Sequence, residues 1–399
     1  MAMSDTGRGV TYARGFTAGA VAAGVKHAGT SRLDLALIVS DRPATAGAVF
    51  TTNQVIAAPC VLTRRHVSGG PLRAIVVNSG NANACTGAPG ERDALAMATA
   101  AALHVGCGPE EVAVASTGVI GVRLPMDRMA PAIATVQASV GGWDDASHAI
   151  MTTDTRPKVA DREIALGGHT VRIGGIAKGA GMIHPDMATL LVFVTTDAAI
   201  DAARLQGAVA AAARHSFNAI SVDGDTSTND TLLVLANGAS GVTVGEAELP
   251  DFAAGLAGIC LELARAVVAD GEGVTKVFEV QVRGAATEAD AERAARTITS
   301  SNLVKTAIHG GDPNWGRILA AAGRSGARVD ATRASVRIGG IAVFATGSLL
   351  PVDDAAIRTV FAGAEIAIEV DLGLGDGTAR AWGTDLSAEY VRINADYTT

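Results

Sequence analysis

Short hydrophobic runs and alanine-rich stretches alternate along the chain. The runs are rich in β-branched and aliphatic residues, as buried strands are, and occupy residues 35–39, 74–77, 111–115, 189–196 and 232–236. Helical patterns lie between them, one over 92–104 and one that Asp201 opens and that reaches about His215. This alternation of strand and helix patterns predicts a mixed α/β fold.

Glycine, asparagine and acidic residues mark the predicted turns. The segment 78–87 reads Asn-Ser-Gly-Asn-Ala-Asn-Ala-Cys-Thr-Gly, which is too rich in Asn and Gly for a helix or strand interior and therefore predicts a loop with many available N–H groups. After Val267, a glycine-rich acidic turn leads into a predicted strand over 277–282. Alternation over 390–394 predicts another strand near the C-terminus.

The composition is that of a globular, aliphatic protein. Its 399 residues, 48% of them hydrophobic, can bury one large core or two medium ones, and the length favours two or three domains. Aromatic residues contribute only 4%, so aliphatic side chains must fill the core. The 47 glycines exceed the usual share of about 7% and indicate many tight turns and close backbone approaches.

Charge and cysteine spacing argue against several kinds of partner. The net charge of -8 and the lack of a Lys/Arg cluster disfavour nucleic acid, so small molecules are the expected ligands. The four cysteines are widely spaced without a CxxC pair, which favours neither a zinc knuckle nor a disulfide framework and fits a reducing cytoplasm. The apolar stretch 18–25 lacks the features of a signal peptide, and no run reaches the roughly 18 residues of a membrane span. We therefore expect a cytoplasmic protein without a membrane segment.

Three common catalytic signatures are missing from the sequence. It has no GxxxxGK[ST] phosphate loop, no GxSxG nucleophile elbow and no HExxH zinc pair. The acidic segment 223–230 superficially suggests a calcium loop, but the EF-hand frame requires Gly where Thr228 stands and Glu where Val234 stands. This segment is therefore predicted to be a hydrogen-bonded turn.

Lys178 is the one charged residue in the glycine-rich, apolar segment 173–183. Because burying an unpaired ammonium is costly, this pattern predicts an anionic partner or ligand for Lys178. A lysine that reaches solvent from a surface loop is the alternative.

Thr189 follows the loop 184–188 and begins a predicted buried strand. A threonine hydroxyl is a poor nucleophile by itself, but cleavage of the preceding bond would free the α-amine of Thr189 as a built-in general base. With a reference pKa of about 7.7 to 8, that amine suits proton transfer near neutral pH. An ordinary strand threonine is the alternative.

These residues resemble the ornithine acetyltransferase family, also called bifunctional glutamate N-acetyltransferase or ArgJ. The resemblance covers essentially the whole chain. Besides 78–87, the segments that carry it are 15–19, 116–121, 150–155, 178–183, 187–189, 223–231, 270–273, 312–317 and Asn394.

The resemblance implies a layered α/β fold of the N-terminal-nucleophile type, like that of DmpA and ArgJ, and self-cleavage between Ala188 and Thr189. An α chain of residues 1–188 would carry the oxyanion turn and the lysine loop, and a β chain of residues 189–399 the nucleophile strand and the C-terminal substrate-binding part. It also implies a ping-pong cycle in arginine biosynthesis, in which N2-acetylornithine acetylates Thr189, ornithine leaves, and glutamate takes the acetyl group. Whether acetyl-CoA also serves as donor stays open, because members with one reaction and with two share these motifs.

The family's functional positions match particular residues of this chain. Thr117 and Gly118 match the pair that stabilises the oxyanion of each tetrahedral intermediate. Lys178 can pair with a substrate carboxylate, Glu272 with an ammonium, and uncharged groups can close the pocket. The full set of matched substrate-binding positions is Thr155, Lys178, Thr189, Glu272, Asn394 and Thr399.

The resemblance implies no metal and no bound organic cofactor, and a heterotetramer of two α and two β chains. Two departures lie in the cleavage loop, where Asp186 replaces the Asn of many relatives and His184 occupies a variable position. Two other functions stay open on fold analogy alone. One is a self-cleaving aminopeptidase or amidase whose acyl-threonine is hydrolysed by water, and the other is a non-enzyme that binds an anionic metabolite through its glycine-rich loops.

Overall fold

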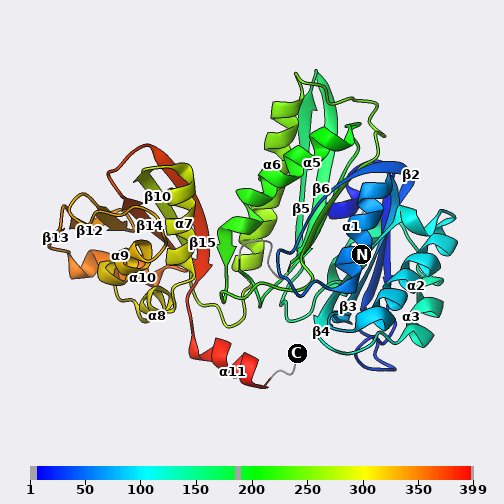
Figure 1. Cartoon of the computed structure of the whole chain (residues 1–399), viewed down its shortest axis with the longest axis horizontal. Helices are drawn as coiled ribbons and strands as arrows, with labels where there is room; N and C mark the ends of the chain where they lie inside the picture. Colours follow the sequence, from blue (N-terminus) through cyan, green and yellow to red (C-terminus); the bar gives the residue numbers. More distant parts are fainter. Residues whose placement is uncertain (1–6, 185–189, 397–399) are drawn as a thin grey trace.

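Residues 7–184 and 190–396, which the computed structural model describes, form two β-sheets in two lobes (Figure 1). The first lobe holds an eight-stranded sheet with the order β4-β3-β2-β9-β7-β6-β5, in which β1 pairs with β2. Its strands are β1 (Phe16–Val21), β2 (Leu35–Phe50), β3 (Leu72–Asn81), β4 (Val112–Val119), β5 (Lys158–Leu166), β6 (His169–Lys178), β7 (Leu191–Thr196) and β9 (Thr231–Ala236).

Strand β2 carries this sheet through two layers. Its residues 35–39 pair with β3, whereas its residues 45–50 pair with β9. The two parts of the sheet pack face to face, because β3 and β4 share one hydrophobic cluster with β7 and β9. Helices cover both outer faces, so the first lobe is a helix–sheet–sheet–helix sandwich. These helices are α1 (Ala58–Gly69), α2 (Gly87–Val105) and α3 (Met126–Ile133) on one face and α5 (Ala202–Arg214) and α6 (Leu249–Val268) on the other.

Strands β7 and β9 form continuous apolar runs because both of their faces are buried. Phe193 of β7 and Leu233 of β9 belong to the cluster between the two sheet layers. Val192 and Leu232, one residue earlier in each strand, pack instead into the cluster under α5 and α6. All four side chains are 0% exposed.

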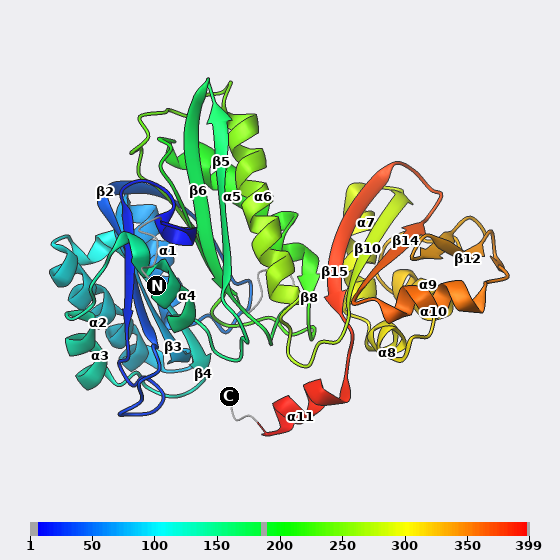
Figure 2. The ribbon, with the colours of Figure 1, turned by 180° about the vertical axis from the view of Figure 1, so that it is seen from behind.

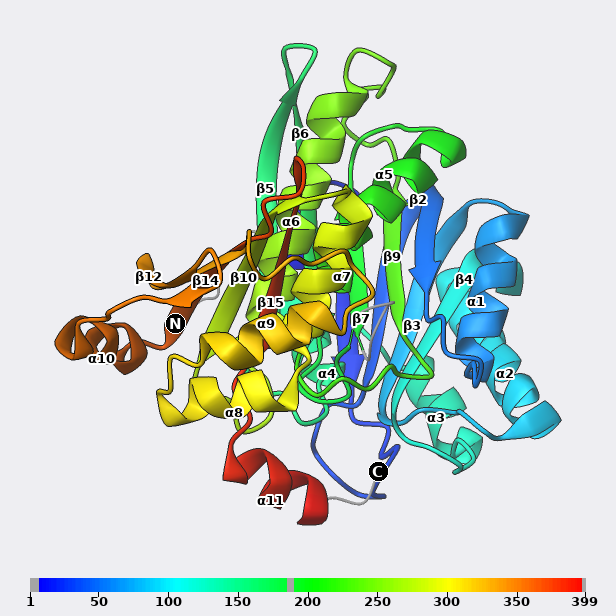
Figure 3. The ribbon, with the colours of Figure 1, turned by 60° about the vertical axis from the view of Figure 1, so that its left-hand side comes forward.

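The second lobe is a seven-stranded sheet with the order β13-β12-β11-β14-β10-β15-β8. Figures 1 and 3 show helices gathered on one face of this sheet. Its strands are β8 (Ile220–Ser221), β10 (Val277–Ala285), β11 (Ser335–Ile338), β12 (Ile341–Ala345), β13 (Ser348–Leu349), β14 (Glu365–Asp371) and β15 (Gly377–Thr384). Its helices are α7 (Glu288–Thr299), α8 (Asn302–Gly310), α9 (Trp315–Gly323) and α10 (Asp354–Ala362).

Strand β8 joins the lobes, because it lies between β7 and β9 in the sequence but pairs with β15. A buried lysine reinforces this junction. The Nζ of Lys305 in α8 donates to the carbonyl oxygens of Val222 and Thr384, both at 2.6 Å. Burial lowers the pKa of Lys305 to about 8. The lobes are therefore held together by polar contacts as well as by strand pairing.

Most of the predicted elements are confirmed. The runs at 35–39, 74–77 and 232–236 lie in β2, β3 and β9, and the run at 111–115 overlaps β4. The helical pattern at 92–104 lies in α2, and Asp201 caps α5 by accepting a hydrogen bond from the Arg204 N–H. The run at 189–196 forms β7 only from Leu191, and Thr189 lies outside the described residues. The strand expected at 277–282 lies in β10.

The loop predicted at 78–87 is wrong for its first four residues, which extend β3 to Asn81. Buried side chains stabilise this polar end of the strand. Asn78 Nδ2 donates to the Asn81 carbonyl at 2.8 Å, and the Ser116 hydroxyl donates to Asn78 Oδ1 at 2.6 Å. Satisfied amide groups therefore take the place of the apolar side chains that a strand interior usually needs.

The strand predicted at 390–394 is wrong, because this segment lies in helix α11 (Ala388–Asp396). The Tyr390 N–H donates to the Ser387 hydroxyl at 3.1 Å, which is a helix-capping contact. Val391, the apolar residue that suggested alternation, is 60% exposed, so no sheet buries this segment. Figures 1 and 2 show α11 leaving the second lobe after β15 and running back toward the first.

The remaining short elements are the helix α4 (Trp143–Ala149) and the 3-10 turns η1 (Gly9–Thr11), η2 (Pro109–Glu111), η3 (Val140–Gly142) and η4 (Phe217–Ala219). Among the described helices, none combines the length and apolarity that a bilayer crossing requires. The four cysteines all lie in the described ranges and are free thiols, and burial raises the pKa of Cys60 and of Cys260 to about 12.

Candidate active site

A cavity of about 90 Å³ opens at the ends of β4 and β6. Five of the residues that the sequence analysis named come together there from four separate parts of the chain. They are Thr117 and Gly118 of β4, Lys178 of β6, Glu272 after α6, and Asn394 of α11. The rest of the lining is Ala82, Ile120, Thr152, Thr153, Gly181, Met182, Ser227, Thr228 and Asn229.

Lys178 is the last residue of β6 and is 2% exposed, so the alternative of a solvent-reaching surface lysine is wrong. Its Nζ donates to the Thr152 hydroxyl at 2.8 Å and to the Thr117 hydroxyl at 3.2 Å. Burial lowers the pKa of Lys178, while the negative charge of Asp154 opposes that shift. Within the described ranges no carboxylate lies at ion-pairing distance, so an anionic ligand for Lys178 stays a prediction.

Thr117 is 3% exposed and ends the buried part of β4. A protonated lysine can only donate, so the Thr117 oxygen accepts from Lys178 and its own hydrogen must be directed elsewhere. Because Thr117 lines the cavity, that hydroxyl can donate to a ligand oxygen inside it. The contact with Lys178 also strengthens the hydroxyl as a donor.

Gly118 has a φ of 135°, which side-chain-bearing residues rarely adopt. A Cβ atom there would lie 2.2 Å from the carbonyl carbon of Gly80 and 2.4 Å from the Asn81 nitrogen. Strands β3 and β4 are therefore in direct backbone contact at this position of the ladder. Only glycine lets the main chain of Gly118 line the cavity in this conformation.

Glu272 and Asn394 form the opposite wall. The Asn394 Nδ2 donates to Glu272 Oε2 at 2.8 Å, which connects helix α11 to the turn after α6. The Glu272 N–H donates to the Ala180 carbonyl at 3.0 Å, so this turn is also tied to the lysine loop. A cation such as an ammonium group could therefore bind to the Glu272 carboxylate inside the cavity.

A buried cluster of three charged side chains, Lys158, Asp154 and Asp270, stabilises the segment next to Lys178. Lys158 donates to Asp154 and, at 2.6 Å, to Asp270. Burial would raise the pKa of Asp154, but the positive charges of Lys178 and Lys158 outweigh it and hold that pKa at about 2. Asp154 also accepts the Gly179 N–H at 2.6 Å. The cluster thus fixes the backbone next to Lys178.

Thr155 does not line the cavity. Its N–H and its hydroxyl both donate to Asp270, and the residue is exposed. Thr152 and Thr153, from the same six-residue motif 150–155, line the cavity instead. The sequence analysis missed Thr152 because nothing local distinguishes the three threonines of this motif.

Ala188, Thr189 and Thr399 lie outside the described residues, and so does Asp186. The neighbouring Leu190 is described. Its N–H donates to Asp230 Oδ1 at 2.8 Å, and its carbonyl accepts the Thr231 N–H at 2.9 Å. On the other side of the gap, His184 Nδ1 lies 3.2 Å from the Ser221 hydroxyl.

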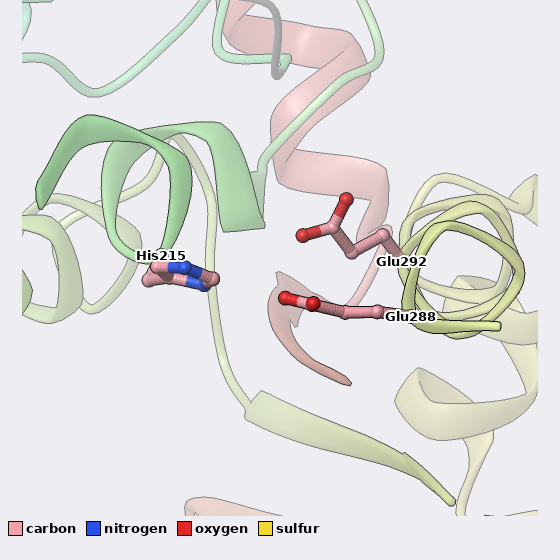
Figure 4. Close-up of side chains that lie close together, drawn as sticks. All are labelled: His215, Glu288 and Glu292. Atoms are coloured by element: carbon pink, nitrogen blue, oxygen red, sulfur yellow. The ribbon is translucent and has the colours of Figure 1, made fainter. Parts of the chain in front are cut away.

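Apart from the cavity, a cluster of potential metal ligands lies between the lobes. Figure 4 shows His215 facing Glu288 and Glu292, which come from α7. Arg214 donates to Glu292 at 2.8 Å and lies 3.6 Å from Glu288, so both carboxylates already share a guanidinium partner. An exposed ion-paired surface accounts for this cluster without a metal ion.

Comparisons with known proteins place this site in a family context. A family model described as "ArgJ family" matches residues 17–399. The arginine biosynthesis bifunctional protein ArgJ of Symbiobacterium thermophilum is 51% identical over 396 residues, which cover 98% of both chains. The protein of the same name from Bacillus subtilis is 45% identical over 394 residues, 98% of this chain and 96% of that protein. A crystal structure of ArgJ from Bacillus halodurans is 42% identical, covers 51% of this chain and 98% of its own, and has a TM-score of 0.50.

The close contact at Gly118 predicts an unusually costly alanine substitution. Gly118→Ala should lower the free energy of unfolding by about 3 kcal/mol or more, because backbone strain adds to a clash with β3. Gly121→Ala is the matched control, since its φ of 83° is also positive but its Cβ would meet nothing within 4 Å. The control should cost about 1 kcal/mol. Denaturant titration measures both, and equal costs would contradict the described contact.

The depressed pKa of Asp154 predicts a pH-dependent stability. The folded pKa of about 2 lies below the unfolded value of about 3.9, so its stabilisation is complete above pH 4 and lost as pH falls toward 2. Asp154→Asn should therefore cost about 2 to 3 kcal/mol at pH 7 and less at pH 3.5.

Denaturant titrations of wild type and variant at both pH values measure this difference. Asp376→Asn, on an exposed turn, is the control and should change stability by less than about 0.5 kcal/mol at either pH. A cost of Asp154→Asn that does not depend on pH would show that the two lysines do not hold this carboxylate ionised.

Proposed function

Since the chain belongs to the ArgJ family, we propose that it is a glutamate N-acetyltransferase of arginine biosynthesis. One observation of the site carries the proposal. Lys178 donates to the hydroxyl of Thr117 in a cavity that Gly118 and Glu272 also line. Acyl transfer needs donors that are in place before negative charge develops, and this arrangement supplies them.

The Thr117 hydroxyl and the Gly118 N–H are the proposed donors to the oxyanion of each tetrahedral intermediate. Lys178 keeps the Thr117 hydroxyl oriented as a donor, because the lysine itself occupies an acceptor position on that oxygen. Preorganised donors of this kind each contribute about 100-fold or more to the rate. Stabilisation of the intermediate is therefore the main chemical role of these three residues.

The same cavity suits a zwitterionic substrate. N2-acetylornithine presents a carboxylate and a side-chain ammonium on either side of its acetamide. Buried Lys178 can bind the carboxylate, and Glu272 can bind the ammonium. The hydroxyl of Thr152, which accepts from Lys178, can donate to the same carboxylate. Glutamate, which carries a carboxylate in the same relation to its amine, then enters as acceptor.

Thr189 is the proposed nucleophile. After cleavage of the Ala188–Thr189 bond, its α-amine takes the hydroxyl proton while the oxygen attacks the acetyl carbon. The C–N bond to ornithine then breaks, and the departing amine takes that proton. In the second half-reaction the glutamate amine attacks the carbonyl carbon of the acetyl-threonine ester. The α-amine of Thr189 takes a proton from that amine and passes it to the threonine oxygen as the C–O bond breaks, which restores the free hydroxyl.

Cleavage would leave both fragments in one body. Strands β7 and β9 belong to the proposed β chain, residues 189–399, and lie between β2 and β6 of the proposed α chain, residues 1–188. Separating the chains would disrupt the central sheet. The solved Bacillus halodurans chain supports processing, because a chain whose 98% matches 51% of this sequence is about half as long. A heterotetramer of two α and two β chains, in the cytoplasm, completes the proposal.

The donor range is proposed to include acetyl-CoA, since the relatives from Symbiobacterium thermophilum and Bacillus subtilis are both named bifunctional. No metal and no bound organic cofactor is needed for acetyl transfer through a threonine ester. A self-cleaving aminopeptidase or amidase is the second candidate. The presence of buried Lys178 and of Glu272 in one cavity favours the transferase, because two opposite charges select an amino acid rather than a longer peptide.

Intact mass of the purified protein tests the proposal directly. Wild type should give two fragments that meet at Ala188 and Thr189, and brief incubation with N2-acetylornithine should add one acetyl group to the C-terminal fragment. Thr189→Ala should remain a single chain and gain no acetyl group, because it has neither the hydroxyl nor the α-amine of a threonine terminus.

Two results would argue against this mechanism. A single uncut wild-type chain without an adduct would contradict both the role of Thr189 as nucleophile and the self-cleavage. Cleavage followed by hydrolysis of the acetyl group, without transfer to glutamate, would favour the amidase. Added glutamate should instead remove the adduct and yield N-acetylglutamate.

A further inference from the structure

Two consecutive buried residues, Asn229 and Asp230, lie where the acidic turn enters β9. They are 4% and 0% exposed. Asn229 contacts the backbone around the Thr117–Gly118 turn, and Asp230 contacts the backbone that follows Thr189 in the sequence. One short segment therefore touches both halves of the proposed reaction centre.

The Asn229 amide is fully used. Its Nδ2 donates to the Ser116 carbonyl at 2.9 Å and to the Ala82 carbonyl at 2.6 Å, and its Oδ1 accepts the Thr228 hydroxyl at 2.6 Å. Ser116 directly precedes Thr117 in β4, and Ala82 directly follows β3. A single amide group thus connects the end of β3 to the end of β4, where Gly118 packs against β3.

The Asp230 carboxyl is used on one side only. Its Oδ1 accepts the Leu190 N–H at 2.8 Å, while Oδ2 is buried and has no hydrogen-bond partner among the described residues. Burial raises the pKa of Asp230 well above its usual range, although the Leu190 N–H, the charge of Lys178 and the Thr51 side chain oppose the shift. A buried oxygen without a well-formed hydrogen bond costs about 1 to 3 kcal/mol, so stability alone does not explain a carboxyl here.

We propose that Asn229 and Asp230 are positioning residues that fix the oxyanion turn at a constant distance from Leu190, the residue that follows the proposed nucleophile in the sequence. The two side chains leave adjacent Cα atoms, which a trans peptide keeps about 3.8 Å apart. The Ser116 carbonyl and the Leu190 N–H therefore cannot move apart without breaking one of these hydrogen bonds. The catalytic consequence rests on the proposed function, because misplacement of reacting groups by about 1 Å can cost about 100-fold in rate.

Asn237 offers a matched control at the other end of the same strand. It directly follows β9, is 7% exposed, and donates from Nδ2 to the Arg14 carbonyl at 2.9 Å. An Asn→Asp change at either position removes a buried amide donor of the same kind. Only the change at Asn229 affects the Thr117–Gly118 turn.

The first experiment compares Asn229→Asp with Asn237→Asp. Asn229→Asp should lower kcat for acetyl transfer by about tenfold to 100-fold with KM changed by less than about threefold, whereas Asn237→Asp should keep kcat within about twofold. Equal effects of the two variants, or an effect on KM alone, would overturn the proposal.

The second experiment uses Asp230, where removal and conservative replacement separate positioning from packing. Asp230→Ala removes the acceptor of the Leu190 N–H and should lower kcat by about tenfold or more. Asp230→Asn retains an acceptor oxygen and should recover most of that loss. If Asp230→Asn is as inactive as Asp230→Ala although it folds, the proposed hydrogen-bond role is wrong.

Hydrogen exchange decides the structural part without any assay of activity. The backbone amides of residues 117–119 should exchange faster in Asn229→Asp than in wild type. Their exchange rates should be the same in Asn237→Asp as in wild type. If these amides are as well protected from exchange in Asn229→Asp as in wild type, the proposed positioning role of Asn229 is wrong, even if wild type transfers acetyl groups. Faster exchange in Asn229→Asp, found together with a wild type that transfers no acetyl group, would instead support the positioning role of Asn229 while the proposed function fails.

Discussion

Burial of one ammonium group is the constraint on which the site depends. Lys178 is 2% exposed, and an isolated charge at such a position would be prohibitively unfavourable. The chain compensates with two threonine hydroxyls at its Nζ and with the negative charge of Asp154 nearby. Asp154 is in turn held ionised by Lys158, which also binds Asp270. These groups come from β4, the threonine motif, the start of β5 and the turn after α6, so satisfying one lysine brings these four segments together.

The sandwich of the first lobe places these turns together. Strands β4 and β6 belong to different layers of the folded sheet, yet both end at the cavity, because β2 runs through both layers and sets their relative position. The second lobe contributes through α11, whose Asn394 binds Glu272. The proposed division of the chain at residue 188 does not follow the lobes. It separates neighbouring strands of one sheet, which explains how a cut there could leave the fold intact.

The sequence predicted the core more reliably than the polar parts. Doubly buried strands such as β7 and β9 are visible as apolar runs, and Lys178, the one charge in its apolar segment, is buried, while its anionic ligand stays a prediction. The predictions for polar segments were less accurate, because the conformation of these segments depends on partners that are distant in the sequence. Asn78 extends β3 only because Ser116 satisfies its amide, and nothing within the threonine motif reveals that Thr152 rather than Thr155 lines the cavity. The choice of Thr189 depended on family resemblance throughout.

The acidic turn 223–230, which fits no calcium frame, has a different use for its carboxyls. Asp223 accepts the N–H groups of Met182 and Ile183 at 2.5 and 2.8 Å, just before the segment that contains the proposed cleavage point. Asp230 accepts the N–H of Leu190, just after it. Because each flank has its own anchor, breaking the bond between residues 188 and 189 removes neither hydrogen bond. The turn can therefore keep Met182, Ile183 and Leu190 in place whether or not the bond between residues 188 and 189 is cut.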